Sequence, residues 1–238
     1  PSGAQNRALM SEDFFRFPHT PHLAWLGPGV PRDDKVLAPA EAQALLAGEV
    51  VVEEKLDGAN LGLSLAPDGR LRAQNRGQYL YEPHAGQFAR LPAWLAQHEA
   101  GLREALTPEL ILFGEWCALT HSIAYTALPD WFVGFDIYDR ASQRFWSLAR
   151  RNALLARIDI PAVPEVTRGR LTLAMVKQLL EETPSACGAP HVEGFVLRRD
   201  AGDWCEARAK LVRADFVQAI DTHWRRRMPA SNRLALTT

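Results

Sequence analysis

The chain has 238 residues, of which 47% are hydrophobic and 23% are charged, and its formal net charge at pH 7 is −1. This length and composition suit one large globular domain or two small ones. They exclude a polycation, so any contact with nucleic acid must come from a local basic surface. No apolar run approaches the roughly 20 residues of a transmembrane helix, and no secretory signal is visible. The three cysteines are widely spaced, which indicates small core residues in a reducing cytoplasm and no disulfide framework.

The first residues differ in character from the rest of the chain. Residues 1–11 are polar and rich in small residues, which indicates a disordered tail or a cloning remnant, and we treat residues 12–238 as one domain. Residues 12–27 are rich in aromatic side chains, and two prolines three positions apart exclude a regular helix there. We therefore expect an extended segment that packs its rings on the body of the protein. His19 and His22 have no carboxylate nearby, and such histidines are more often structural than ligand-binding.

Residues 53–60, which read Glu-Glu-Lys-Leu-Asp-Gly-Ala-Asn, lie between two apolar runs. The pattern predicts a strand, a tight turn at Asp-Gly, and a second strand. Strand alternation places Glu53, Lys55 and Asp57 on one face. A lysine at the end of a strand, beside a turn, can lie over a cleft, which is where a lysine nucleophile is needed. Taken alone, however, Lys-x-Asp-Gly is common at ordinary hairpins where the lysine is merely solvated.

The rest of the chain alternates apolar runs with stretches of helical periodicity. Apolar runs bounded by turn residues predict strands at residues 50–52, 61–65, 71–76, 110–116, 131–138, 191–199 and 207–212. Helical spacing predicts helices at residues 39–48, 88–106, 147–158, 172–181 and 214–227. Ser147 and Thr172 are the predicted N-caps of the third and fourth helices. The pattern predicts an α+β fold in which two antiparallel β-sheets, flanked by helices, enclose a cleft. The chain has no glycine-rich phosphate loop of either common type.

Six polar stretches, each on a predicted strand or at its end, follow one another along the chain. In order they are Lys55-x-Asp57-Gly58-x-Asn60, Arg76-Gly77, Phe113-Gly114-Glu115, Phe135-Asp136, Glu193-Gly194-Phe195-Val196 and Arg208-Ala209-Lys210. This order resembles the six motifs of the covalent nucleotidyltransferase superfamily, which comprises polynucleotide ligases and mRNA capping enzymes. The resemblance covers about residues 50–213. Each motif is weak alone, but six in the right order, each on a predicted strand or at its end, make a strong signal.

Within the superfamily the chain looks most like the RNA ligase 2 group of ATP-dependent RNA ligases. DNA ligases and capping enzymes typically carry arginine at the place of Asn60. The alternatives are an ATP-dependent DNA ligase, a GTP-using capping enzyme, or a non-catalytic nucleic-acid-binding relative of the same fold. The last is disfavoured because the residues most needed for chemistry are intact: Lys55, Glu115, Glu193 and Lys210.

The resemblance implies a three-step reaction that uses ATP and Mg²⁺ or Mn²⁺ in a nucleotide cleft. Lys55 attacks the α-phosphate and expels pyrophosphate, which leaves a lysyl-adenylate. The adenylate then moves to a 5′-phosphate of RNA, and a 3′-hydroxyl attacks to join the strands and release AMP. Whether the RNA ends meet in a nicked duplex, an RNA/DNA hybrid or a single strand is left open.

The resemblance also assigns residues to the reacting end of the nucleotide. Lys55 must be neutral to attack, and burial, cations or a metal can each lower its pKa. Lys210, with Arg208, would neutralise the α-phosphate. Glu193 would hold the metal through its water ligands, because Mg²⁺ gives up water reluctantly; otherwise it pairs with an arginine. Asn60 belongs to the same nucleotide-binding set.

Five further residues are assigned to the nucleoside end. Glu115 would accept hydrogen bonds from the ribose, or else pair with an arginine. Phe135 would stack on adenine, or else be a core aromatic. Arg76 would contact the ribose or the phosphates. Glu53 and Glu54 would border the base, through backbone groups alone if not through their side chains.

Two features depart from the family pattern. Arg208 stands where relatives carry lysine, and its planar fork delivers charge differently from an ammonium group. Only 28 residues follow Lys210, too few for an OB-fold or a helical accessory domain. We therefore expect a stand-alone domain, a fragment, or a subunit whose binding to nucleic acid is supplied by an end-healing or nucleic-acid-binding partner protein. The basic residues at 225–227 are the expected intrinsic contact with phosphates.

Overall fold

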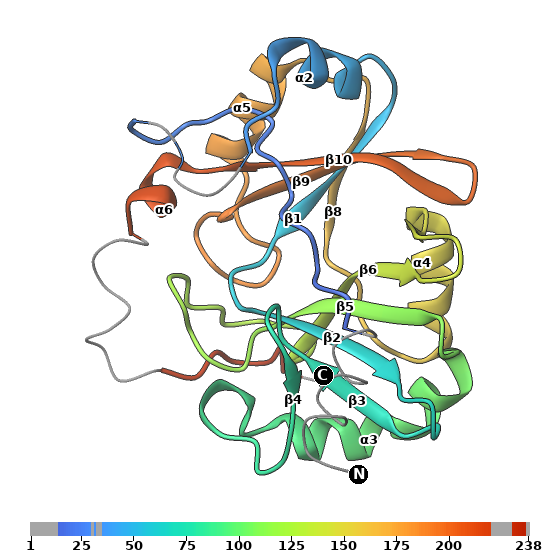
Figure 1. The fold of residues 1–238 in the computed structure, drawn as a ribbon. Helices are drawn as coiled ribbons and strands as arrows, with labels where there is room; N and C mark the ends of the chain where they lie inside the picture. The colour runs from blue at the N-terminus through green and yellow to red at the C-terminus, as the bar shows by residue number, and fades with distance from the viewer. Residues whose placement is uncertain (1–13, 30, 32–34, 220–229, 237–238) are drawn as a thin grey trace.

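In the computed structural model, which describes residues 14–29, 31, 35–219 and 230–236, the strands form two antiparallel sheets, as the sequence predicts (Figure 1). The larger sheet has, in spatial order, β4 (Tyr79–Leu80), β3 (Leu71–Gln74), β2 (Ala59–Leu65), β5 (Leu110–Trp116), β6 (Phe132–Asp139) and β7 (Arg144–Phe145). The smaller sheet has β10 (Trp204–Val212), β9 (Gly194–Ala201), β1 (Val50–Lys55) and β8 (Glu165–Gly169). The fold class is therefore the predicted α+β arrangement.

Helices cover the outer faces of the two sheets (Figure 1). On the six-stranded sheet pack α3 (Leu91–Ala105) and α4 (Leu148–Arg157), and on the four-stranded sheet pack α2 (Pro39–Leu46) and α5 (Leu173–Glu182). The remaining short helices are η1 (Gly86–Phe88) and α6 (Ala214–Ala219). Among the described helices, none is both long enough and apolar enough to cross a bilayer.

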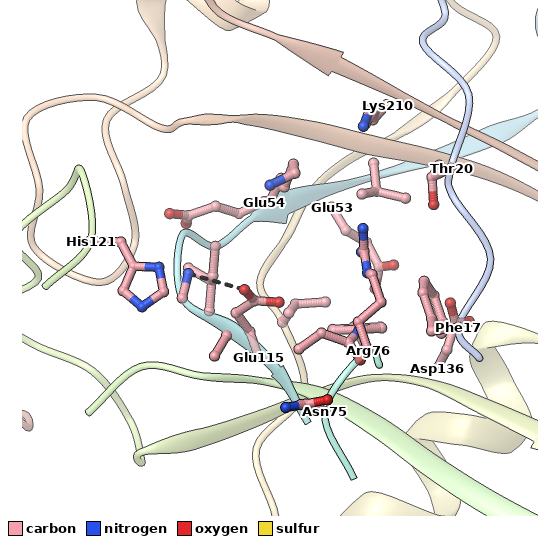
Figure 2. A pocket seen from close by; sticks show the side chains of 18 of the residues that line it. Phe17, Thr20, Glu53, Glu54, Asn75, Arg76, Glu115, His121, Asp136 and Lys210 are labelled. Atoms are coloured by element: carbon pink, nitrogen blue, oxygen red, sulfur yellow. Dashed lines mark hydrogen bonds between the residues drawn. The ribbon is translucent and has the colours of Figure 1, made fainter. Parts of the chain in front are cut away.

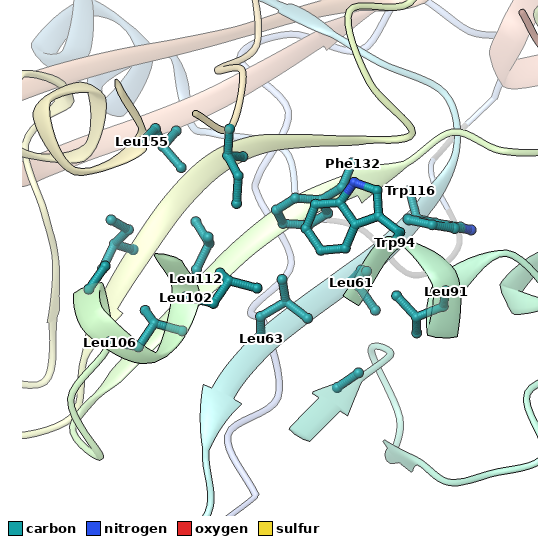
Figure 3. Packing of buried hydrophobic residues seen from close by; sticks show 14 of the residues in the cluster. Leu61, Leu63, Leu91, Trp94, Leu102, Leu106, Leu112, Trp116, Phe132 and Leu155 are labelled. Atoms are coloured by element: carbon teal, nitrogen blue, oxygen red, sulfur yellow. The ribbon is translucent and has the colours of Figure 1, made fainter. Parts of the chain in front are cut away.

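The largest core lies between the six-stranded sheet and its two helices (Figure 3). Trp94 of α3 packs against Phe132 of β6, with 5.2 Å between ring centroids, and against Trp116 of β5, at 6.1 Å. Leucines from the same strands and helices fill the space around these rings. The predicted helix at 88–106 is confirmed from Leu91 onward, whereas Phe88 belongs to the 3₁₀ turn before it. This core packs α3 and α4 against the six-stranded sheet.

The strands on either side of Lys55 do not pair with each other. β1 pairs with β8 and β9 in the smaller sheet, whereas β2 pairs with β3 and β5 in the larger one. The turn at Asp57-Gly58 is therefore a crossover between sheets and not the tight turn of a hairpin. Asp57 lies beyond β1, and its Oδ2 accepts hydrogen bonds from the backbone of Ser122 at 2.6 Å and Ile123 at 3.0 Å. The predicted shared face thus ends at Lys55, which stands where the two sheets diverge.

Several local predictions are confirmed by the cap geometry. The side chain of Ser147 accepts a hydrogen bond from the backbone of Arg150 at the start of α4. The side chain of Thr172 does the same for Met175 at the start of α5. Each cap satisfies one of the amide groups that a helix leaves without a partner in its first turn.

Other predictions differ in extent from the structure. The strand predicted at 191–199 begins only at Gly194, and β8 was missed because it is a polar, partly exposed strand without an apolar run. Of the last predicted helix, α6 accounts for the start; the basic residues at 225–227 lie outside the described residues.

The extended N-terminal segment is confirmed over its described part. Phe14 contacts Tyr79 edge to face at 5.2 Å, and Phe15 stacks on Tyr138 at 3.6 Å between centroids. The buried ring of His22 packs beside a tryptophan, which agrees with a structural role for this histidine.

Candidate active site

A cavity of about 600 Å³ lies between the two sheets, within the size range of small-molecule sites (Figure 2). Nine of the ten predicted site residues line it: Glu53, Glu54, Lys55, Asn60, Arg76, Glu115, Phe135, Arg208 and Lys210. The tenth, Glu193, is not part of the lining but accepts hydrogen bonds from Lys55, which is. The structure thus brings together residues that are spread over more than 150 positions of the sequence.

Lys55, the last residue of β1, is held by a carboxylate. Its Nζ donates to both Oε1 and Oε2 of Glu193 at 2.7 Å, and the two side chains are 28% and 11% exposed. Burial lowers the pKa of Lys55, but the carboxylates of Glu193, Glu115 and Asp57 outweigh it and leave that pKa above its ordinary value. Without a ligand, Lys55 is therefore an ammonium ion and not the neutral amine expected from burial.

Glu115 lies across the crossover from Lys55. Its Oε1 accepts a hydrogen bond from the backbone N–H of Gly58 at 3.0 Å. Burial raises the pKa of Glu115 to about 7, against the opposing effects of Lys55 and Gly58 and with a further contribution from Glu193. A side chain at Gly58 would place its Cβ 2.5 Å from the carbonyl oxygen of Trp116. Glycine is therefore required for the crossover to approach β5 closely enough to bind Glu115.

The side chains of Glu53 and Glu54 are both committed to structural partners. Glu53 receives two hydrogen bonds from Arg151, from Nη2 at 2.6 Å and from Nη1 at 3.2 Å. Glu54 accepts from the hydroxyl of Ser185 at 2.5 Å and from the backbone of Ala186 at 2.9 Å. This arrangement leaves their backbone groups, and not their carboxylates, to border a ligand.

Two buried arginines hold Phe135 from behind, and neither was among the predicted site residues. Arg151 donates to the carbonyl of Phe135 at 2.6 Å, and Arg198 donates to the same oxygen at 3.2 Å. Both are at most 2% exposed, so they act inside the protein and not at its surface. Arg151 lies on an amphipathic helix, where arginine normally reads as a solvated residue, which explains why the sequence pattern did not reveal it.

Arg208, whose departure from the family pattern left its role open, is bound to the wall of the cavity. Its Nη1 donates to Asp136 at 2.5 Å, and its guanidinium lies 4.0 Å from the ring centroid of Phe145 and 4.7 Å from that of Phe17. A planar guanidinium suits this combination of an ion pair and ring contacts better than an ammonium does.

The cavity also contains groups whose hydrogen-bonding capacity is unused. The Oδ1 atom of Asn60 is buried and has no hydrogen-bond partner among the described residues. Buried polar atoms usually have a hydrogen-bond partner, so this acceptor is suited to a ligand that donates a hydrogen bond.

Phe17, Thr20 and His121 also line the cavity and were not predicted. Their stretches carry no motif; only the aromatic richness of residues 12–27 hinted at Phe17.

Comparisons with known proteins give a consistent picture. The family model described as RNA ligase matches residues 48–212, a region that includes every predicted site residue. No curated protein sequence matches the chain.

The solved structures that match include several of an RNA ligase from Naegleria gruberi. An arginine-to-alanine mutant with ATP and Mn has a TM-score of 0.61 and 18% identity, over 87% of this chain and 58% of that one. A glutamate-to-alanine mutant with AMP and Mn has a TM-score of 0.61 and 17% identity, with the same coverage. The ligase with pyrophosphate has a TM-score of 0.58 and 18% identity, over 86% of this chain and 64% of that one. This chain therefore spans less than two thirds of their length, and the likeness shows a common fold.

Proposed function

Because the chain belongs to the RNA ligase family, we propose that its cavity binds ATP and that Lys55 becomes adenylylated in the first step of RNA strand joining. The Nζ–P bond forms at the α-phosphate as the bond to pyrophosphate breaks. The AMP group next passes to a 5′-phosphate on RNA. Attack by a 3′-hydroxyl then forms the phosphodiester and releases AMP.

The observation that carries this proposal is the placement of Lys55. It is the one lysine of the cavity that lies at the crossover between sheets, with Glu193 bonded to it and Glu115 close enough to raise its pKa. An ordinary solvated hairpin lysine would have neither burial nor two carboxylates around it.

The other cavity residues supply what a nucleotide needs. Phe135, held by two arginines, offers a ring for adenine to stack on. Glu115, with a pKa of about 7, can donate to or accept from ribose hydroxyls. Arg76 and Lys210 supply the positive charge for the phosphates.

Lys55 must lose its proton before it attacks, because an ammonium ion has no lone pair. The described residues contain no cluster of three metal-ligating side chains, so side chains alone would not enclose a cation here. Mg²⁺ is commonly bound by one or two carboxylates together with water and phosphate oxygens, and Glu193, which is bonded to Lys55, can supply one carboxylate. Glu193, water and the nucleotide phosphates would hold Mg²⁺ or Mn²⁺ there. Its charge would offset the carboxylates that raise the pKa of Lys55. The Naegleria ligase structures with ATP and Mn support this choice.

We propose RNA, and not DNA, as the substrate, and the RNA ligase 2 group as the subfamily, on the basis of the family match and Asn60. An ATP-dependent DNA ligase and a non-catalytic nucleic-acid-binding relative are the alternatives. An assay that offers equal amounts of nicked RNA and nicked DNA distinguishes an RNA ligase from a DNA ligase. Tight binding of a nicked duplex by this chain alone, measured at rising salt, would argue against a partner protein that supplies the affinity for nucleic acid.

The proposal is tested by mass spectrometry of the intact chain after incubation with ATP and Mg²⁺. The wild type should gain the mass of one AMP, and Lys55→Ala should not. Lys177→Ala, which removes an exposed lysine of α5, is the matched control and should gain AMP normally. Absence of the adduct from a folded wild type, with Mn²⁺ and GTP also tried, would reject covalent nucleotidyl transfer.

A further inference from the structure

Residues 14–23, which we call the N-terminal strap, precede the region matched by the RNA ligase family, yet they are fixed to the six-stranded sheet. The side chain of Gln74 donates from Nε2 to the carbonyl of Phe15 at 2.8 Å. The ring of Phe15 stacks on Tyr138 of β6 with an interplanar angle of 12°.

The other end of the strap is fixed to the four-stranded sheet. The backbone N–H of Lys210 donates to the carbonyl of Pro21 at 2.8 Å, and the N–H of Leu23 donates to the carbonyl of Lys210 at 2.7 Å. The strap thus crosses from one sheet to the other (Figure 1). It forms a wall of the cavity at the point where both sheets contribute site residues.

Phe17 is the part of this wall next to the expected base site. It is 5% exposed and meets the ring of Phe135 edge to face at 5.3 Å. Its other neighbours are Phe113, at 4.9 Å between ring centroids, and the guanidinium of Arg208. Phe17 therefore acts through Phe135 and Arg208, as a positioning residue.

Thr20 is the part of the wall next to Lys210. It lines the cavity and precedes the proline whose carbonyl is bonded to Lys210, and Figure 2 shows it near that lysine. Its hydroxyl makes no hydrogen bond with the residues that the structure describes. Two residues lie between it and Phe17, so three extended steps of the chain span about 10 Å at most.

The neighbours of Lys210 identify this end of the cavity. Burial raises the pKa of Glu193, and Lys55 and Lys210 both oppose that effect, so the two lysines share one electrostatic neighbourhood. Thr20 therefore stands near the lysine that would receive the α-phosphate, and Phe17 stands near the ring that would receive the base.

We propose that the Thr20 hydroxyl donates a hydrogen bond to the α-phosphate of the bound nucleotide, beside Lys210, so that the strap completes the nucleotide site. The inference rests on the proposed function for the identity of the ligand. A hydroxyl that donates to a phosphate oxygen makes a charge-assisted bond, which is stronger than a neutral one.

The test compares Thr20→Val with Thr20→Ser in the full chain, by calorimetric titration with AMP and with adenosine. Valine keeps the shape of threonine and removes the hydroxyl, whereas serine keeps the hydroxyl. We expect Thr20→Val to weaken AMP binding by about tenfold, the value of one hydrogen bond to a charged group. Adenosine affinity should be unchanged in Thr20→Val, and Thr20→Ser should bind AMP like the wild type.

The inference is overturned if Thr20→Val binds AMP as tightly as the wild type, or if it loses the same factor for adenosine. It is also overturned if the wild type does not bind AMP. An unchanged melting temperature of Thr20→Val excludes a folding defect as the cause of any loss. A wild type that binds AMP through Thr20 but forms no lysyl-AMP from ATP would reject the proposed function alone, so the two failures are distinguishable.

Discussion

Replacement of Arg151 by methionine should destabilise the protein more than any ordinary ion-pair mutation. Arg151 and Glu53 are 1% and 2% exposed, and two hydrogen bonds join them. Methionine keeps the volume of the aliphatic stem and removes all the donors. It would leave the Glu53 carboxylate buried with much less compensation, and the Phe135 carbonyl would lose its shorter hydrogen bond.

The magnitude follows from the partners that remain. Breaking a buried pair by removing one charge typically costs about 3–5 kcal/mol. Arg198 still lies 3.8 Å from Glu53, so part of the carboxylate's charge stays compensated. We therefore expect the low end of that range, about 3 kcal/mol of unfolding free energy. Since domains are stable by only about 5–15 kcal/mol, this loss is a large share of the total.

Urea unfolding at pH 7 measures the effect, in a double-mutant cycle with Glu53→Gln. Because glutamine is neutral, the double mutant has no buried carboxylate left without its partner. It should therefore be more stable than additivity predicts, by about 1 kcal/mol or more. Arg103→Met is the matched control: it breaks the exposed Arg103–Glu99 pair of α3 and should cost less than about 1 kcal/mol. If Arg151→Met costs no more than Arg103→Met, or if the cycle is additive, the reasoning is refuted.

Three further outcomes are expected. Glu115→Gln should flatten the pH dependence of stability: the folded-state pKa of about 7 exceeds the unfolded value, so the wild type loses stability as pH rises from about 4.5 to 7, by up to about 3 kcal/mol, and melting curves at pH 5 and 8 compare the two. Gly58→Ala should abolish most lysyl-AMP formation, because its Cβ meets a backbone oxygen, whereas Gly48→Ala, whose Cβ meets only a side chain at 3.4 Å, should retain it; equal adduct yields in both would contradict this. Ser147→Ala should lower the unfolding free energy by about 1 kcal/mol through loss of the α4 cap, and Ser147→Thr should recover most of it in the same urea titration.

Local sequence signals predicted the features that depend on neighbouring residues. Ser147 and Thr172 act as caps because a hydroxyl can reach an amide three residues on, which spacing alone reveals. The apolar runs of β2, β5 and β6 were recognisable because both faces of these strands are largely buried. The order of the motifs predicted which residues meet in the cavity, and nine of the ten predicted residues line it.

Features that depend on distant partners could not be read in the same way. Nothing local distinguishes a hairpin turn from the crossover at Gly58, because the choice of partner strands is made by packing elsewhere. Arg151 and Arg198 look like surface residues in any window of the sequence, and the carboxylates of Glu53 and Asp136 that compensate their charges come from distant strands. The pKa of Lys55 likewise depends on carboxylates contributed by other strands.

The salt bridge between Lys55 and Glu193 also bears on chemical selectivity. A free, neutral lysine amine reacts with many electrophiles, such as acyl phosphates and aldehydes. In this protein both oxygens of one carboxylate bind the ammonium group and the pKa of Lys55 is raised, so the neutral fraction that could react with such compounds is smaller than for an exposed lysine. We therefore expect such compounds to modify Lys55 more slowly than the exposed lysines of the free protein, until a ligand changes the charge around the pair.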